Sequence, residues 1–362
     1  MNLNTIKFSK EGKADFISTL RGRVNEYFST KNISKYGNSK MVLKTVYNLC
    51  MYFIPYALIL SGIFTSNWVL FLLWAAMGFG MAGIGMCVMH DANHNAYSKN
   101  GTINKMLGNL IIFVGGNAIN WKIQHNRLHH GYTNIDGIDE DIYSGNLMRF
   151  SPHQKRFKIH RLQHFYAWFF YGLMTVNWST AKEFKQLFSY KKRGLIDERK
   201  KSFAFLLTQL ITSKLFYQFY VLILPIIILP TAWWIILLMY FCMHFVAGFI
   251  LGIVFQTAHV MPDTEYPLPD KGGNISNSWG VHQLLTTSNY SPTSRFFSWF
   301  IGGLNYQIEH HLFPSVCHIH YRNLSPIVKQ TAKEFGVPYH VQSNFFLALL
   351  NHAKLLRSLG KA

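Results

Sequence analysis

The chain has 362 residues, of which 49% are hydrophobic, 16% aromatic and only 14% charged. Soluble domains usually contain about 25% charged residues, so this deficit indicates a membrane protein. The formal net charge of +19 suits an anionic lipid surface or an acidic protein partner. Nucleic acid is not expected as a partner, because the basic residues flank apolar runs and form no recognisable binding motif.

Four apolar segments are long enough to cross a bilayer, which takes about 20 helical residues. In chain order they lie at 45–64, 68–89, 215–229 and 233–255. Short breaks, TSN and PT, separate the members of each pair, so we expect two transmembrane hairpins. The third segment is short unless it extends upstream past Lys214.

The distribution of positive charge orients these hairpins. None of the 35 Lys and Arg residues falls in the two short breaks. Because positive charge collects on the cytoplasmic side, both termini and the remaining polar segments are expected there. The predicted fold is therefore an all-α, multi-pass integral membrane protein with four transmembrane helices and a helical cytosolic cap. Its membrane would be a bacterial plasma membrane or the endoplasmic reticulum.

We expect one domain over 1–362, divided by the spans into five parts. These parts are an N-terminal arm at 1–44, a first hairpin at 45–89, a cytosolic segment at 90–214, a second hairpin at 215–255 and a cytosolic segment at 256–362.

Many of the 17 histidines are grouped near the expected cytosolic ends of the spans. HDANH (90–94) follows the second span, and HNRLHH (125–130) lies in the middle segment. His259 follows the fourth span, and QIEHH (307–311) lies beyond it. The four-span topology places all of these groups on one side of the membrane, which indicates a shared site.

The spacing within these groups fits metal binding. Helical residues i and i+4 share a face, so His90 and His94 can converge on one point, as can His125 and His129. His130 would point about 100° away from His129 and could reach a second metal.

The number of histidines indicates more than one metal ion. Together with His310 and His311 there are seven or eight, which exceeds the four ligands of a structural zinc site. Imidazole binds zinc, iron, copper or nickel, so the ligand type leaves the metal open. The carboxylate ligands and Glu-x-x-His pairs of soluble di-iron bundles are not found in this sequence.

The three motifs HxxxH, HxxxHH and QxxHH resemble the histidine boxes of the membrane fatty-acid desaturase family, over roughly residues 44–320. Gln307, which opens the third box, and the segment WGVHQLLTTSNYS (279–291) resemble the front-end and linoleoyl-CoA desaturase branch. Many eukaryotic members of that branch have a fused cytochrome b5 domain with an HPGG motif, and this sequence has no HPGG. The electrons are therefore expected from a separate donor such as ferredoxin or cytochrome b5.

This resemblance implies an oxidoreductase of lipid metabolism that uses two iron ions (Fe2+/Fe3+), O2 and an external electron donor. Its substrate would be a fatty acyl chain, linked to CoA or to a lipid, in which it introduces a double bond while O2 is reduced to water. Acid–base groups alone cannot attack an unactivated C–H bond, which agrees with a redox metal.

The resemblance also assigns residues, none of them catalytic apart from the metal centre. The implied iron ligands are His90, His94, His125, His129, His130, His259, His310 and His311. His259 matches a ligand that only some members supply. The residues expected to adjust the metals from neighbouring positions are Gln307, Asp91, Glu309 and His282.

Other functions remain open at this point. A membrane hydroxylase of a lipid, sterol, carotenoid or alkane would need the same irons. A metal transporter would place its site near the bilayer midplane, which disagrees with histidines at the span ends. A lipid-binding relative without activity is a third alternative.

Three further motifs have plainer interpretations. HRLQH (160–164) repeats the HxxxH spacing but is expected to form a basic interfacial face. GFGMAG (78–83) matches GxGxxG inside a span, where small residues allow close helix contact or leave room for an acyl chain. A basic patch before the third span is expected to anchor the loop beside anionic lipid, with docking of an acidic electron donor as the alternative. It consists of Lys191, Lys192, Arg193, Arg199, Lys200 and Lys201.

Overall fold

The computed structural model describes residues 6–9, 14–197, 199 and 201–361. Positions 1–5 and 10–13 of the expected N-terminal arm lie outside the described residues, as do 198, 362 and Lys200 of the basic patch.

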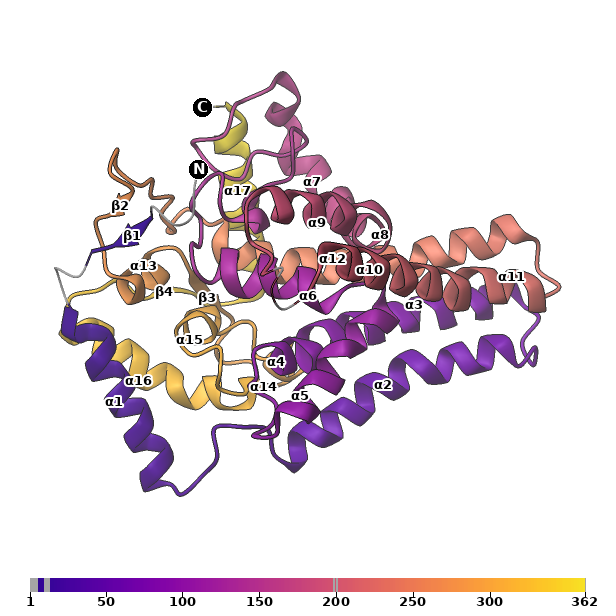
Figure 1. Ribbon diagram of the computed structural model, residues 1–362, viewed down its shortest axis with the longest axis horizontal. Helices are drawn as coiled ribbons and strands as arrows, with labels where there is room; N and C mark the ends of the chain where they lie inside the picture. Colours follow the sequence, from indigo (N-terminus) through magenta and orange to yellow (C-terminus); the bar gives the residue numbers. More distant parts are fainter. Residues whose placement is uncertain (1–5, 10–13, 198, 200, 362) are drawn as a thin grey trace.

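Four continuous helical segments within the described residues are long and apolar enough to cross a membrane. They are Ser39–Leu60, Asn67–Asn93, Phe203–Ile228 and Trp233–His259. These segments extend together toward one end of the molecule, and the other elements gather at the opposite end as a cap (Figure 1). Strand β1 and the C-terminal helix α17 both lie at the cap end. The prediction of an all-α protein with four long apolar helices is confirmed.

Two of the four long helices contain a π-helical turn, and the other two are uninterrupted α-helices. The first long helix is α2 (Ser39–Leu60), and the fourth is α12 (Trp233–His259). The second consists of α3 (Asn67–Gly83), η2 (Ile84–Met89) and α4 (His90–Asn93). The third consists of α10 (Phe203–Gln218), η8 (Phe219–Ile223) and α11 (Leu224–Ile228). Such π-helical turns are frequent at functional sites, and η2 ends directly before His90.

The third long helix begins at Phe203 rather than at residue 215. The hydroxyl of Ser202 caps its first turn by accepting from the backbone N–H of Phe205. Lys214, the charge that had limited the expected span, is buried and pairs with Glu183 of α9. Its ammonium also donates to the carbonyl of Gly115, at 2.5 Å. Because the charge is neutralised inside the protein, it does not end the helix.

The cap contains the remaining helices. The α-helices are α1 (Ala14–Thr30), α5 (Gly101–Gly108), α6 (Ala118–Trp121), α7 (Gln163–Gly172), α8 (Met174–Asn177), α9 (Glu183–Lys192), α13 (Trp279–Leu285), α14 (Arg295–Phe300), α15 (Gln307–Leu312), α16 (Tyr321–Glu334) and α17 (Phe345–Lys361). The 3-10 and π turns are η3 (Asn109–Val114), η4 (Lys122–His129), η5 (Glu140–Ile142), η6 (Lys158–Leu162), η7 (Trp178–Lys182) and η9 (His318–His320).

Two short parallel strand pairs fasten distant segments of the cap to each other. Strand β1 (Lys7–Phe8) pairs with β2 (Asn274–Ile275), and β3 (Ser288–Tyr290) pairs with β4 (His340–Gln342). These pairs connect the N-terminal and C-terminal parts of the chain to the segment between the fourth long helix and the third histidine box.

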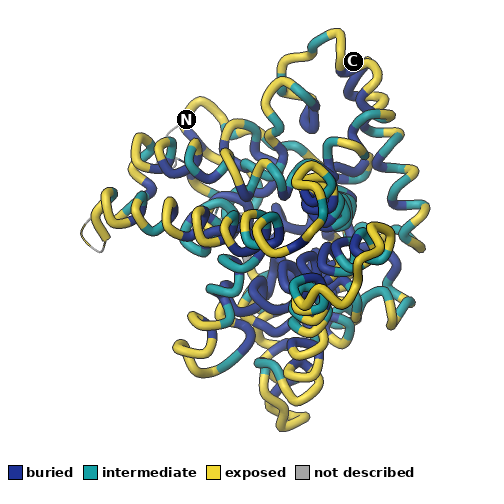
Figure 2. Tube along the Cα trace, turned by 90° about the vertical axis from the view of Figure 1, so that its right-hand side faces the viewer, coloured by how far each residue is buried: buried dark blue, intermediate teal, exposed yellow. Residues whose placement is uncertain are grey.

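The long helices bury one side and expose apolar side chains on the other. Trp74 and Met77 of α3 are fully buried in a core shared with α2, η8 and α12, whereas Trp68 is 82% exposed and Leu72 is 70% exposed. Buried residues lie through the middle of the molecule, and exposed residues follow its outer turns (Figure 2). Large exposed apolar side chains on helices of this length are typical of a lipid-facing surface.

The GFGMAG segment brings α3 into direct backbone contact with its neighbours. A Cβ atom on Gly80 would lie 2.6 Å from the backbone nitrogen of Tyr52 in α2. On Gly78 it would lie 2.6 Å from the carbonyl oxygen of Met243 in α12. These glycines therefore allow close helix contact, one of the two roles that the sequence left open.

Substitution of Gly80 by alanine should destabilise the protein, because neither helix backbone can move away cheaply. We expect Gly80→Ala to lower stability by about 1–3 kcal/mol, seen as a lower midpoint of thermal unfolding in detergent. Gly85→Ala is the matched control in the same long helix, because its Cβ would meet only Leu251 at 3.6 Å. Equal midpoints for the two variants would contradict this account of the packing.

Candidate metal centre

All eight histidines of the predicted site are buried, and they come from four separate helical segments. Helix α4 and its C-terminal cap provide His90 and His94; η4 and the next residue provide His125, His129 and His130; α12 ends with His259; α15 provides His310 and His311. The most exposed of the eight, His94, is only 9% exposed. The helices thus end at one common, buried location.

The imidazoles form two adjacent groups, each able to hold a metal ion. Within each group the potential ligand atoms all lie within 4.8 Å of one another. The first group is His90, His94, His125 and His310, and the second is His129, His259 and His311.

His130 lies between the two groups. Its Nε2 atom is 3.2 Å from Nε2 of His125 and 3.0 Å from Nε2 of His310, both in the first group. Its ring is stacked on His311 of the second group, with 4.3 Å between the ring centroids. The structure therefore brings together all eight histidines that the sequence singled out.

The second histidine box is π-helical, which the expected α-helical spacing did not include. The backbone N–H of His130 donates to the carbonyl of His125, five residues earlier, at 2.9 Å. This turn places His125 and His130 on the same side of the segment. His125 and His129 have Nδ1 atoms near one carboxylate, that of Asp141, yet their rings belong to different histidine groups.

In several imidazoles Nδ1 is hydrogen-bonded to a neighbouring group. This hydrogen bond fixes the orientation of the ring and leaves Nε2 as the atom available to a metal. The holding partners are Asp139 for His129 (3.1 Å), the carbonyl of Thr286 for His259 (3.2 Å), the hydroxyl of Tyr321 for His310 (3.1 Å) and the amide oxygen of Gln283 for His311 (2.8 Å).

The buried Nε2 atoms of His94, His259 and His311 have no hydrogen-bond partner among the described residues. An unsatisfied buried polar atom costs about 1–3 kcal/mol, so several in one place favour a ligand that satisfies them together. Neutral imidazole is a ligand for iron, zinc, copper and nickel. The residues present therefore fit a pair of metal ions.

Burial also keeps most of these imidazoles in the form that binds metal. Burial, followed by repulsion from neighbouring imidazoles, holds the pKa of His94, His130, His310 and His311 well below the ordinary value. These rings are therefore neutral at pH 7, with a lone pair free for coordination.

His129 is the exception, because two carboxylates face it. Burial lowers its pKa, but Asp139 and Asp141 outweigh that effect and raise the pKa to about 9. The pKa of Asp141 is raised by burial, yet His129 and His125 hold it below its usual range overall. Without a metal, His129 is consequently protonated at neutral pH.

Asp139 and Asp141 are the main residues that the sequence reasoning missed. They belong to the run DGIDED (136–141), which contains four of the only 16 acidic residues in the chain and follows the second box closely. That concentration of acidic residues beside a histidine box was the available indication.

The carboxylates of Asp91 and Glu309, which are next to predicted ligands in the sequence, make hydrogen bonds to other residues. Asp91 accepts hydrogen bonds from the ring and the backbone N–H of His318, at 2.8 Å and 3.1 Å. Glu309 accepts from the hydroxyl of Tyr339 at 2.6 Å and from Asn289 at 2.8 Å, and burial raises its pKa to about 7. Among the described residues, neither carboxylate is hydrogen-bonded to one of the eight imidazoles.

The two uncharged neighbours named from the sequence differ in their contacts. The Nε2 atom of His282 lies 2.9 Å from the carbonyl oxygen of Thr133, and this contact joins α13 to the loop after the second box. Burial lowers the pKa of His282 to about 4. Gln307 is 1% exposed, and its amide nitrogen has no partner among the described residues.

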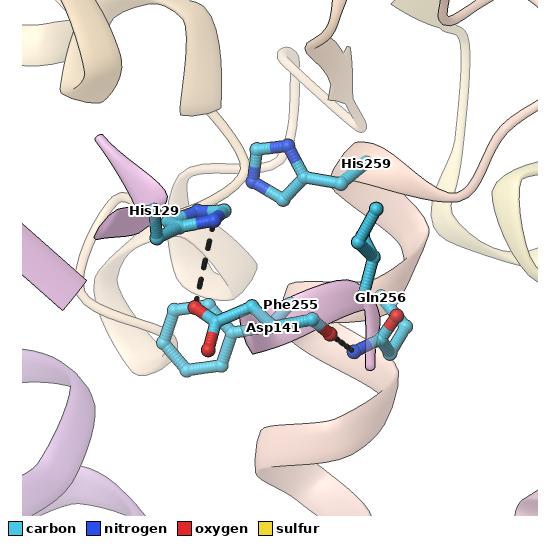
Figure 3. A pocket seen from close by; sticks show the side chains of 6 residues that line it. His129, Asp141, Phe255, Gln256 and His259 are labelled. Atoms are coloured by element: carbon cyan, nitrogen blue, oxygen red, sulfur yellow. Dashed lines mark hydrogen bonds and ion pairs between the residues drawn. The ribbon is translucent and has the colours of Figure 1, made fainter. Parts of the chain in front are cut away.

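A cavity of about 10 Å³ adjoins the second group, and its lining includes His129, Asp141, Phe255, Gln256 and His259 (Figure 3). This volume has room for about one water molecule. The side chain of Asp141 is 24% exposed, so the histidine groups approach solvent at this point.

The HRLQH motif belongs to no candidate metal group among the described residues. His160 instead stabilises the start of η6, where its Nδ1 accepts from the backbone N–H of Phe157 at 3.2 Å. The HxxxH spacing alone therefore does not identify a metal ligand.

Loss of the Asp139 charge should weaken metal binding. We expect Asp139→Asn to lower metal affinity by about 10- to 100-fold, because the ring of His129 loses the carboxylate that orients it. Metal content after dialysis against a chelator measures this. Asp136→Asn, three residues away and bonded to Gln154 rather than to a histidine, is the matched control and should retain its metal.

Metal affinity should rise with pH. A metal must displace the proton of His129, whose pKa is about 9 in its absence, so the affinity should increase about tenfold per pH unit below that value. Titration with Zn2+, which undergoes no redox change, from about pH 6.5 to about pH 8.5 measures the slope. A pH-independent affinity would show that His129 is not a ligand.

Comparison with known proteins agrees with this geometry. The fatty acid desaturase family matches residues 66–343 of the chain. The sn-1 linoleoyl-lipid 6-desaturase of Synechocystis sp. is 36% identical over 364 residues, which cover 99% of this chain and 98% of that protein.

Two further relatives have similar names. The sn-1 linoleoyl-lipid 6-desaturase of Arthrospira platensis is 34% identical and aligns with 99% of this chain and 96% of its own length. The acyl-lipid (8-3)-desaturase of Physcomitrium patens is also 34% identical, over 98% of this chain and 74% of its own length. None of these relatives favours a hydroxylase or a metal transporter. Histidine boxes, fold and relatives together show that the chain belongs to the fatty acid desaturase family.

Proposed function

We propose that this fatty acyl desaturase is a front-end enzyme that acts on acyl chains of membrane lipids, using O2 and two iron ions bound by its eight buried histidines. The observation that supports this most directly is the pair of adjacent imidazole groups where long apolar helices enter the cap. The relatives, named as desaturases of lipid-linked acyl chains, support a lipid-linked substrate over a CoA ester.

The overall reaction converts two adjacent methylenes, O2, two electrons and two protons into a double bond and two molecules of water. A methylene in the middle of an acyl chain has no acidic proton, so the side chains of the site cannot remove its hydrogens alone. When bound, the two irons would supply the redox chemistry that activates O2 and breaks these C–H bonds.

The contribution of the chain is to position the imidazoles and to keep the site dry. Asp139, Gln283 and Tyr321 fix the orientation of ligand rings through Nδ1. All eight histidines are buried, and the adjoining cavity has room for little more than one water. Exclusion of water protects a reactive centre from side reactions.

Two of the long helices end at this site, which supports a position next to the bilayer. The second one ends at Asn93 beside the first histidine box, and the fourth one ends at His259. An acyl chain lying among lipid tails would therefore approach the site from the membrane side. The turns 61–66 and 229–232 contain no Lys or Arg, which supports a cytosolic site and cytosolic termini in a bacterial plasma membrane or the endoplasmic reticulum.

The two electrons would come from a separate protein, of the ferredoxin or cytochrome b5 class. The printed sequence has no HPGG haem motif.

Fatty-acid profiling of cells that express the protein tests this function. Mass spectrometry that locates double bonds should find a new unsaturation in membrane lipids. His129→Ala should reduce it by more than about 100-fold while the protein still inserts into the membrane.

His164→Ala is the control, because His164 belongs to HRLQH and to no metal group among the described residues. It should retain the new double bond. Hydroxylated products without unsaturation, or full activity of His129→Ala, would overturn the proposed function.

A further inference from the structure

A groove of about 400 Å³ lies on the cap, between α1 and the segment that follows α15. Its floor is apolar and includes Phe28, Leu312 and Phe313, which are all buried. Arg21 and Lys35 supply its charge, and no carboxylate is among the described residues that line it. An apolar centre with a charged edge is the usual composition of a specific protein interface.

The groove adjoins the metal centre directly. Trp279 is part of its lining, and the indole Nε1 donates to the carbonyl of His130, the residue between the two histidine groups, at 3.1 Å. Leu312 of the floor follows His311 in α15. One side chain therefore separates a partner in this groove from the candidate metal ligands.

The basic patch around Lys192 and Lys201 is the competing surface, and its route to the site is longer. There the path leads from Arg193 of the patch through Glu140 and the next residue, Asp141, to His129, so two residues lie between the patch and the candidate ligand. Because electron transfer slows steeply with distance, the short route through Trp279 favours the groove.

We propose that this groove is the docking site of an acidic one-electron carrier protein. The inference rests on the proposed function, which consumes two electrons per double bond. Each docking event would oxidise the reduced centre of the carrier by one electron and reduce the metal pair by one, so two events supply one reaction cycle. Attraction between an acidic carrier and this cationic chain would speed the encounter and weaken with salt.

Binding measurements on the full-length, metal-loaded protein test the proposal separately from desaturation. The probes are an acidic [2Fe–2S] ferredoxin and a cytochrome b5 haem domain, each titrated at low and at high salt. The double variant Arg21→Glu/Lys35→Glu should weaken binding of the preferred probe by at least about tenfold and reduce its salt dependence.

The matched control is Lys192→Glu/Lys201→Glu, which makes the same change of charge on the basic patch. It should alter the dissociation constant by less than about threefold. Unchanged metal content and unfolding temperature in both variants would show that they fold normally.

Three results would overturn the groove as the docking site. They are normal binding by the groove variant, a larger loss in the basic-patch variant, and no salt-sensitive binding of either probe to the unsubstituted protein. If a probe binds in the groove while the cells contain no new double bond, the proposed function fails and the docking site does not.

Discussion

Nitrogen atoms of several buried imidazoles face one another across about 3 Å, for example Nε2 of His90 and His125 at 3.1 Å. Within the described part of the chain, the buried Nε2 atoms of His94, His259 and His311 have no hydrogen-bond partner, and leaving such atoms unsatisfied costs free energy. A cation at each group would satisfy these atoms together. The helix ends, the π-helical turns and the acidic residues behind the site all serve to hold the rings in this arrangement.

The fold places this cluster of buried histidines at the ends of the second and fourth long helices. Close backbone contact at Gly78 and Gly80 fixes α3 against α12 and α2, so the second and fourth long helices deliver His90 and His259 in a defined position. The cap then closes over the site with short helices joined by strand pairs. Family membership and geometry therefore agree on a fatty acyl desaturase, with a buried histidine cluster at the ends of two long apolar helices.

Much of this could be predicted from the sequence, because hydropathy, box spacing and charge distribution are local properties. The partners of Asp91 could not be predicted, since His318 lies far away in the chain. The π-helical second box was also missed, because its histidine spacing fits an ordinary α-helix. Hydropathy places the start of the third span too late, because the charge of Lys214 interrupts the apolar segment. In the structure Glu183 neutralises Lys214, and a hydropathy pattern cannot show this contact between residues far apart in the chain.

The central claim is that the eight histidines hold two metal ions in one shared site. X-ray absorption at the iron edge, together with an iron count on the purified protein, tests it most directly. The account predicts about two irons per chain with nitrogen ligands and the outer-shell scattering of imidazole. A single iron per chain, or sulfur among the ligands, would contradict it.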